Sequence, residues 1–305
     1  ERKPALVSDI KAEQGGVGKY KTTSLMSAPV TCSPMKMGDE VLGVINVTDR
    51  KDNQPFSGDD LNLLMTMADV SASYVRLMNL TEELKKSEKI KQELEIARNI
   101  QYRLLPARPP KINNLDVAGR CITAERVGGD YYDHFVKQNP VFAVADVSGH
   151  SIGAALIMAA FRAAIRSQLL TCSDISVVVQ QLNRILYEDL FQAEQFVSLA
   201  LVEYCPTRKM VSFTTAGHPP ILVWRASSKK FETYFTEDPL IGIEQMAVYN
   251  SAKIALQKDD IVLIYSDGLT EASNIEGDRL GLSNVQKIIS KSSGKNSEGI
   301  VEDLM

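Results

Sequence analysis

The hydrophobic positions in the first part of the chain follow a strand-like pattern. The runs KPALVSDI, TTSLMSAPV and DEVLGVINVTDR are rich in aliphatic and β-branched residues, and the glycine-rich stretch EQGGVGKY separates the first two. These runs predict three β-strands. The next run, QPFSGDDLNLLMTMADV, changes to helical spacing. Ser57 with Asp60 three residues later has the form of a capping box, which predicts a helix with Ser57 as its N-cap.

A long helix is predicted next, because neither proline nor glycine occurs from Asp59 until Pro106. Leu77, Leu80 and Leu84 step by three and four residues, as in the seam of a coiled coil. The pattern continues at Ser87, Ile90, Leu94, Ala97, Gln101 and Leu104. A helix of this length, about 70 Å at 1.5 Å per residue, has little core of its own, so we expect it to pair with a second copy. The alternative is two helices that pack back on one domain.

The pattern from about Leu115 onward is that of an α+β domain. Two helices are predicted at residues 153–170 and 176–191. Short turns join the strands from Phe196 to Arg225, which predicts an antiparallel meander. Helices gathered in one block beside antiparallel strands favour α+β layering over a parallel sheet. The predicted strands are LDVAGRCI, PVFAVADV, FVSLALVEYC, KMVSFTTAG, PILVWR and DIVLIYSD.

Composition narrows the class of protein. A chain of 305 residues is long enough for two domains. The net charge of −4 does not indicate a nucleic-acid or anionic-lipid partner. The longest apolar run, residues 154–161, is too short to span a membrane, and no signal peptide is evident. The four cysteines are scattered, which disfavours a zinc site or disulfide framework and fits a reducing cytoplasm.

Three aspartates stand at glycine-rich turns or at the ends of apolar runs. Asp130 follows two glycines in VGGDYYD, Asp146 ends the run FAVAD before VSGH, and Asp267 ends the run in IYSDGLTEA. A buried carboxylate is costly unless it is paired or binds a metal. Carboxylate oxygens suit hard cations such as Mg²⁺ or Mn²⁺. A single Asp-Gly after a strand is more often a turn residue, so the metal interpretation depends on the three occurring together.

The histidines and the absence of two other motifs limit which other kinds of catalytic site the chain could have. His218, in TTAGHPP, is expected to bond to backbone at a turn, and His134 is notable only for its position beside Asp133. His150 lies four residues after Asp146 and could assist phosphate binding or proton transfer. The chain has neither the GxSxG elbow of serine hydrolases nor the spacing of a P-loop.

Five motifs together resemble the SpoIIE-type serine phosphatases, the bacterial branch of the metal-dependent protein phosphatases related to protein phosphatase 2C. They are ELEIARNIQYRLLP, VGGDYYD, FAVADVSGH, TTAGHPP and IYSDGLTEA. VLGVINVTDR followed by FSGDDLNLLMTMADVSA resembles the second half of a GAF sensor domain. The resemblance implies a partial α/β GAF-like domain at residues 1–75, a coiled-coil helical linker at 76–106 and a phosphatase domain at 107–305.

The resemblance also implies an αββα sandwich with two divalent ions, Mn²⁺ or Mg²⁺, between its sheets. Asp130 would bind one ion, Asp146 would bridge both with the Val147 carbonyl as a further ligand, and Asp267 would bind the other. A water between the ions would become the nucleophile that attacks a phosphoserine or phosphothreonine. His150, Gly268 and Asp133 are possible accessory residues.

The chain departs from the family pattern in three places. The family usually closes with an Asp-Asp-x-Thr motif on a last strand, whereas this chain stops at GIVEDLM, which predicts a helix. We therefore expect a C-terminally truncated phosphatase domain, poor in metal. Ser151 stands where relatives commonly have glycine. The chain also begins partway into the GAF-like domain.

The first functional hypothesis is a cytoplasmic phosphoprotein phosphatase regulated by its GAF-like domain. The resemblance implies that its substrate is a phosphorylated anti-anti-sigma factor, a STAS-domain protein of a bacterial partner-switching pathway. It also implies a homodimer through the linker and an unknown small-molecule or protein signal at the GAF-like domain. The alternative is a non-catalytic sensor or dimerisation module whose phosphatase-like domain only binds partners. A GAF-type cyclic-nucleotide receptor is compatible with the first hypothesis.

Overall fold

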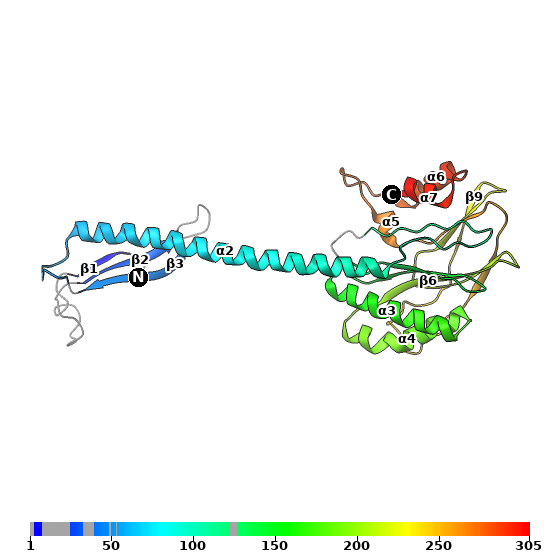
Figure 1. Cartoon of the computed structure of the whole chain (residues 1–305), viewed down its shortest axis with the longest axis horizontal. Coiled ribbons are helices and arrows are strands. Elements are labelled where there is room, and N and C mark those ends of the chain that lie inside the picture. Colours follow the sequence, from blue (N-terminus) through cyan, green and yellow to red (C-terminus); the bar gives the residue numbers. More distant parts are fainter. Residues whose placement is uncertain (1–2, 8–24, 33–39, 49, 53, 123–126) are drawn as a thin grey trace. The chain divides into compact units, whose positions relative to one another are not determined.

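The computed structural model describes the chain except residues 1–2, 8–24, 33–39, 49, 53 and 123–126 (Figure 1). The chain divides into two compact units, Glu1–Gln92 and Glu93–Met305. The glycine-rich stretch EQGGVGKY lies outside the described residues.

The first unit has an antiparallel sheet in the order β1-β2-β3, with strands at Ala5–Val7, Leu25–Cys32 and Glu40–Thr48. The beginning of helix α2 (Gly58–Leu104) packs on this sheet through Leu64, Ala68 and Ala72. Their spacing of four residues puts all three on one face of the helix. The three strands predicted from the sequence are therefore confirmed where the structure describes them.

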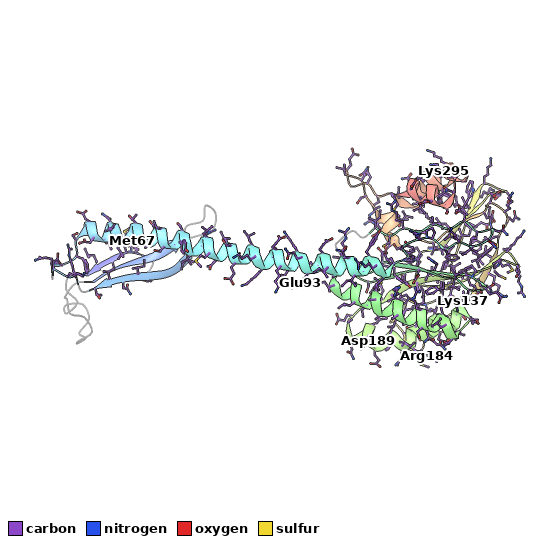
Figure 2. The ribbon with its side chains drawn as sticks, in the orientation of Figure 1. Met67, Glu93, Lys137, Arg184, Asp189 and Lys295 are labelled. Atoms are coloured by element: carbon purple, nitrogen blue, oxygen red, sulfur yellow. The ribbon has the colours of Figure 1, made fainter. Side chains whose placement is uncertain are left out.

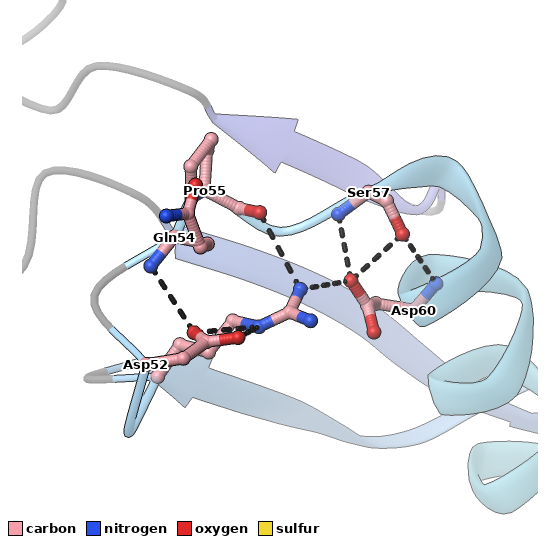
Figure 3. Close-up of polar contacts among 6 residues, drawn as sticks. Asp52, Gln54, Pro55, Ser57 and Asp60 are labelled. Carbon is pink, nitrogen blue, oxygen red and sulfur yellow. Dashed lines mark hydrogen bonds and ion pairs between the residues drawn. The ribbon is translucent and has the colours of Figure 1, made fainter.

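The first turn of α2 is fixed by the predicted capping box (Figure 3). The Ser57 backbone N–H donates to Asp60 Oδ2 at 2.8 Å, and the Asp60 backbone N–H donates to Ser57 Oγ at 3.2 Å. Arg50 Nη1 lies 2.5 Å from the same carboxylate. The hydrogen bonds from Ser57, with a smaller contribution from Arg50, lower the pKa of Asp60. The helix thus begins where the sequence predicts.

Helix α2 is unbroken from Gly58 to Leu104, so the alternative of two helices packed back on one domain is wrong. The predicted seam residues Leu77, Leu80 and Leu84 are 62%, 45% and 69% exposed in the single chain. A stretch of this helix therefore carries apolar side chains that the chain itself does not bury.

The second unit is a sandwich of two antiparallel sheets between two layers of helices (Figure 1). The five-stranded sheet has the order β10-β7-β6-β5-β4, and the three-stranded sheet has the order β11-β8-β9. The strands of the larger sheet are β4 (Tyr131–Phe135), β5 (Val141–Val147), β6 (Val197–Cys205), β7 (Met210–Ala216) and β10 (Ala252–Ala255). Those of the smaller sheet are β8 (Ile221–Arg225), β9 (Lys230–Tyr234) and β11 (Ile261–Leu263).

Three apolar clusters hold the layers together. Helices α3 (Ile152–Thr171) and α4 (Ile175–Gln192) pack on the larger sheet, and residues of β6, β7 and β8 meet between the two sheets. Helices α6 (Gly281–Ser292) and α7 (Ser297–Leu304) cover the smaller sheet around Trp224. The predicted αββα order is therefore confirmed.

Helix α4 has one side buried against the larger sheet and one side exposed. Arg184 and Asp189 lie on the exposed side of α4 (Figure 2), whereas Leu182, Asn183 and Leu186 are buried. Lys295, between α6 and α7 (Figure 2), pairs with Asp303 at 2.7 Å.

One described helix, α3, is long and apolar enough to cross a membrane by length and composition alone. Five of its residues are buried against the larger sheet and α4, and a core helix passes the same test. These buried residues are Ala154, Met158, Phe161, Ile165 and Leu169.

Two strand predictions are wrong in this unit. The run LDVAGRCI forms no strand in its described residues and contributes only an isolated bridge between Ile112 and Leu115. The Tyr132 hydroxyl instead lies 3.3 Å from the carbonyl oxygens of both Pro106 and Gly119 and shares its one proton between them, so a side chain rather than a strand ladder holds this segment. The predicted meander also divides, because β8 leaves β7 and joins the other sheet.

Candidate metal centre

Strand β5 places Asp146 between the two sheets. Val141, Ala143, Ala145 and Val147 are buried on the side of α3 and α4. Because side chains alternate along a strand, Asp146 points to the opposite side. Phe142, on that same side, packs in the cluster between the sheets.

A glycine brings the segment of Asp130 against the end of β5. The Val147 N–H donates to the Gly129 carbonyl at 3.3 Å. A Cβ at position 129 would lie 2.1 Å from the Val147 carbonyl oxygen and 3.0 Å from Asp146 Oδ1. Only glycine permits this approach, so the sequence VGGD sets Asp130 beside Asp146 and the Val147 carbonyl.

Asp267 reaches the same place from the smaller sheet. It is the first residue of helix α5 (Asp267–Glu271), which follows β11 after a short link. The Ser266 side chain lies close enough to Asp130 to act on the pKa of its carboxyl group. Three segments that are far apart in sequence therefore meet at Asp130, Asp146 and Asp267.

The electrostatics of the three carboxylates reflect this convergence. Burial, followed by the negative charges of Asp130 and Asp267, raises the pKa of Asp146 from 3.8 to about 7. Burial and the charge of Asp267 also raise the pKa of Asp130, and the Ser266 side chain acts in the opposite direction. The folded chain thus holds negative charge here at a cost that a cation would remove.

The donor set fits a hard divalent cation. Within the described residues, no group of three or more His, Cys, Asp or Glu side chains is arranged so that it could hold a metal ion. Mg²⁺ usually keeps several waters and binds one or two carboxylates, so a closed protein cage is not required. The oxygens that could hold such ions are the carboxylates of Asp130, Asp146 and Asp267 and the carbonyl of Val147.

A cavity of about 350 Å³ opens beside these carboxylates. Its walls combine two acidic side chains with apolar and small polar ones, which leaves room for a phosphoryl group next to the candidate metal ligands. The lining residues are Asp146, Phe196, Ser198, Gly217, His218, Pro219, Leu240 and Asp267.

His218 belongs to this cavity, which the sequence interpretation did not predict. The side chain is buried, with Nδ1 2.9 Å from Ser198 Oγ, and Nε2 has no partner with normal hydrogen-bond geometry. Burial lowers its pKa to about 4, partly offset by the Tyr265 carbonyl. The ring is therefore neutral near pH 7. The motif TTAGHPP was the available signal, but a histidine at a turn usually bonds to backbone.

The accessory residues are more dispersed. Asp133 is buried on the α3 side of β4, where Arg166 Nη1 lies 2.5 Å away and the Tyr131 hydroxyl donates at 2.9 Å. Asp133 therefore forms a partly buried ion pair on the α3 side of β4, and its accessory role stays a prediction. His150 is exposed in the turn after β5, and Gly268 lies in α5.

Comparison with known families matches both parts of the chain. The family model described as stage II sporulation protein E (SpoIIE) matches residues 137–305, more than half of the chain. The chain belongs to the SpoIIE family. A GAF domain model matches residues 1–75 of this SpoIIE-family chain.

Curated relatives carry names that indicate a reaction. The phosphoserine phosphatase RsbU of Bacillus subtilis (strain 168) is 30% identical over 219 residues, which cover 71% of this chain and 64% of RsbU. The phosphoserine phosphatase RsbP of the same organism is 26% identical over 187 residues, covering 59% of this chain and 46% of RsbP. The SpoIIE-family chain thus spans less than two thirds of the length of either relative.

A solved structure supports the fold. The SiaA-PP2C domain of Pseudomonas aeruginosa superposes with a TM-score of 0.61 at 18% identity, covering 72% of this chain and 89% of that domain. The SpoIIE-family chain therefore has a PP2C-like fold.

Proposed function

We propose that this chain is a metal-dependent serine/threonine phosphoprotein phosphatase. The observation that carries the proposal is the convergence of Asp130, Asp146 and Asp267 beside one cavity, with the pKa of Asp146 raised to about 7 by burial and by the other two. The names of RsbU and RsbP support phosphoserine as the substrate group.

Each part of the site has a role in this reaction. Asp130, Asp146, Asp267 and the Val147 carbonyl would hold two ions, Mn²⁺ or Mg²⁺. Such ions, when bound, lower the pKa of a water and neutralise phosphoryl charge. The remaining steps concern the chain's own residues, which must bind and orient the phosphorylated side chain.

His218 and the apolar wall would orient that side chain. If the Ser198 hydroxyl donates to Nδ1, the neutral ring carries its proton on Nε2 and can donate it to a phosphoryl oxygen. Phe196, Pro219 and Leu240 line the same cavity and would exclude bulk water from it.

The activity test is release of phosphate from a phosphoserine protein with and without Mn²⁺. We expect turnover that requires the metal and falls at least about 100-fold in Asp146→Asn. Asp259→Asn is the matched control, because Asp259 is exposed and its positive φ of 65° is one that asparagine tolerates. Full activity of Asp146→Asn would contradict the assignment, and a chain that binds metal without turnover would support the partner-binding alternative.

The substrate class that we propose is a phosphorylated STAS-domain anti-anti-sigma factor in the bacterial cytoplasm. The SpoIIE resemblance supports it. The test compares hydrolysis of such a phosphoprotein with that of a phosphoserine peptide of the same local sequence. Equal kcat/KM values would count against recognition of the folded STAS domain.

We propose that a signal at the GAF-like part regulates the phosphatase activity through helix α2, and that α2 pairs with the same helix of a second copy. Support comes from the exposed seam residues Leu77, Leu80 and Leu84. A Leu84→Cys variant is expected to form a disulfide dimer above the background of the parent chain. Lys86→Cys, two residues further on and pointing away from the seam, is the control. Equal cross-linking of the two variants would contradict a specific seam.

A further inference from the structure

We infer that Gln101 is a positioning residue for the candidate metal centre, because its side-chain amide holds the backbone of Gly128, two residues before Asp130. The inference extends the proposed function, and the effect of Gln101 on metal binding rests on that function. It concerns how the end of helix α2 is connected to a metal ligand.

The side chain of Gln101 forms hydrogen bonds with both the N–H and the carbonyl of Gly128. Gln101 Nε2 donates to the Gly128 carbonyl at 2.5 Å, and the Gly128 N–H donates to Gln101 Oε1 at 3.2 Å. Gln101 is only 8% exposed, while its neighbours Ile100 and Tyr102 are 59% and 70% exposed. The buried amide is therefore directed at Gly128 and not into solvent.

The contact explains a polar residue in the hydrophobic pattern. Gln101 occupies a predicted seam position of α2, where the other members of the pattern are mostly apolar. A buried glutamine requires partners for both ends of its amide. The two backbone groups of Gly128 supply one partner for each end, so the amide is matched to this peptide.

The held segment leads directly to the metal ligands. Gly129 follows Gly128, and its carbonyl accepts from the Val147 N–H at 3.3 Å. Two consecutive glycines offer no side chains for anchoring and have the greatest backbone freedom to lose. Two sets of hydrogen bonds therefore hold the residues just before Asp130. Gln101, in the last turn of α2, binds Gly128, and Val147, at the end of β5, binds Gly129.

A substitution to glutamate separates this role from simple packing. Gln101→Glu keeps the size of the side chain and an acceptor for the Gly128 N–H. It removes the donor and sets a carboxylate against the Gly128 carbonyl. Gln92→Glu is the matched control, since it makes the same change at an exposed position of the same helix. Gln101→Met, similar in shape and without polar atoms, is the second variant.

The primary measurement is Mn²⁺ binding, followed by the electron paramagnetic resonance signal of the free ion. We expect Gln101→Glu and Gln101→Met to bind Mn²⁺ about tenfold or more weakly than the parent, as for residues that orient metal ligands. Gln92→Glu should bind as the parent does. In phosphatase assays the Mn²⁺ concentration for half-maximal activity should rise by the same factor, while kcat at saturating Mn²⁺ is largely kept.

The outcomes separate this inference from the proposed function. Unchanged Mn²⁺ affinity in both folded Gln101 variants would overturn it. If the parent itself does not bind Mn²⁺, the proposed function fails. Hydrogen exchange at the amides of Gly128, Gly129 and Asp130 then decides. Faster exchange in the Gln101 variants than in Gln92→Glu upholds the positioning role, and equal exchange refutes it.

Discussion

Asp146 combines two properties that are rarely found together in a stable core. It is the last residue but one of strand β5, whose other face is buried, and burial followed by the charges of Asp130 and Asp267 raises its pKa to about 7. A carboxyl with such a pKa is partly protonated near neutral pH unless a cation takes the place of the proton. In the metal-free protein, ionisation of Asp146 therefore lowers the free energy of unfolding, and this loss grows as the pH rises.

The first prediction concerns this loss of stability. The pKa of Asp146 is higher in the folded chain than its ordinary 3.8, so the folded state holds the proton more tightly. The resulting stabilisation is complete below about pH 4 and is lost as the pH rises through about 7. In EDTA, Asp146→Asn should be more stable to urea than the parent at about pH 8, and this advantage should shrink as the pH falls.

Asp259→Asn serves as the control, because the same change at an exposed site should leave the pH dependence of the parent intact. A constant difference in stability between Asp146→Asn and the parent across this pH range would contradict the raised pKa.

The second prediction concerns Gly129. In Gly129→Ala the added Cβ would overlap the Val147 carbonyl oxygen, since 2.1 Å is far below any normal contact. We expect a loss of about 1–3 kcal/mol in the free energy of unfolding together with weaker Mn²⁺ binding. Gly294→Ala, where a Cβ meets nothing within 4 Å, is the control. Tight Mn²⁺ binding by Gly129→Ala would show that this close approach is not needed.

Residues of the site differ in how far the sequence could predict them. Asp130 follows two glycines, whereas Asp146 and Asp267 end apolar runs, and these local patterns together with the family motifs singled out the three aspartates. Ser198, His218 and Gln101 act through partners 20 or more residues away, and no local pattern reports such contacts. Asp133 is the opposite case. It shares the motif VGGDYYD with Asp130, but its side chain pairs with Arg166 of helix α3.

At the scale of elements, helix α4 fixes a loop that forms part of the cavity wall. Asn183 is fully buried, and its Nδ2 donates to the carbonyls of Glu244 and Gln245 at 2.8 and 3.2 Å. The Gly242 N–H donates to its Oδ1 at 2.8 Å. Leu240, two residues before Gly242, lines the cavity. A single polar side chain in the core thus connects α4 to the wall of the candidate site.

The third prediction follows from these hydrogen bonds. Asn183→Ala leaves backbone groups of the loop buried without partners and creates a small cavity, so we expect a loss of about 2–4 kcal/mol. Trp224, the single tryptophan, lies in the core of the second unit and reports its unfolding in urea. Arg184→Ala, at an exposed position of α4, should change stability by less than about 0.5 kcal/mol. Equal effects of the two substitutions would contradict the role of Asn183.

The predicted elements succeeded where hydrophobic period and length agreed. Helices α3 and α4 and strands β5 to β8 follow apolar runs with clear turns at their ends. Strand β4 escaped prediction because its sequence, YYDHF, includes two polar residues, and the buried one is offset by Arg166 from another element. Strand β9, KFETY, is mostly exposed and lies at a sheet edge, so its hydrophobic pattern is weak.

For the whole molecule, the layers explain how distant segments form one site. The larger sheet supplies Asp146 from β5, the turn before β4 supplies Asp130, and the smaller sheet leads through β11 to Asp267. Two sheets packed face to face bring their strand ends together at one edge. The fold class could be predicted because helices and strands occur in separate blocks, whereas the exchange of β8 between sheets depends on packing that no single run reveals.

Direct metal binding tests the central claim, that Asp130, Asp146 and Asp267 form one cation site. Mn²⁺ titration of the parent chain is compared with titrations of Asp130→Asn, Asp146→Asn, Asp267→Asn and the control Asp259→Asn. We predict that each of the first three variants loses at least about tenfold in affinity while the control binds as the parent does. Parent-like Mn²⁺ binding by all three variants would contradict the account.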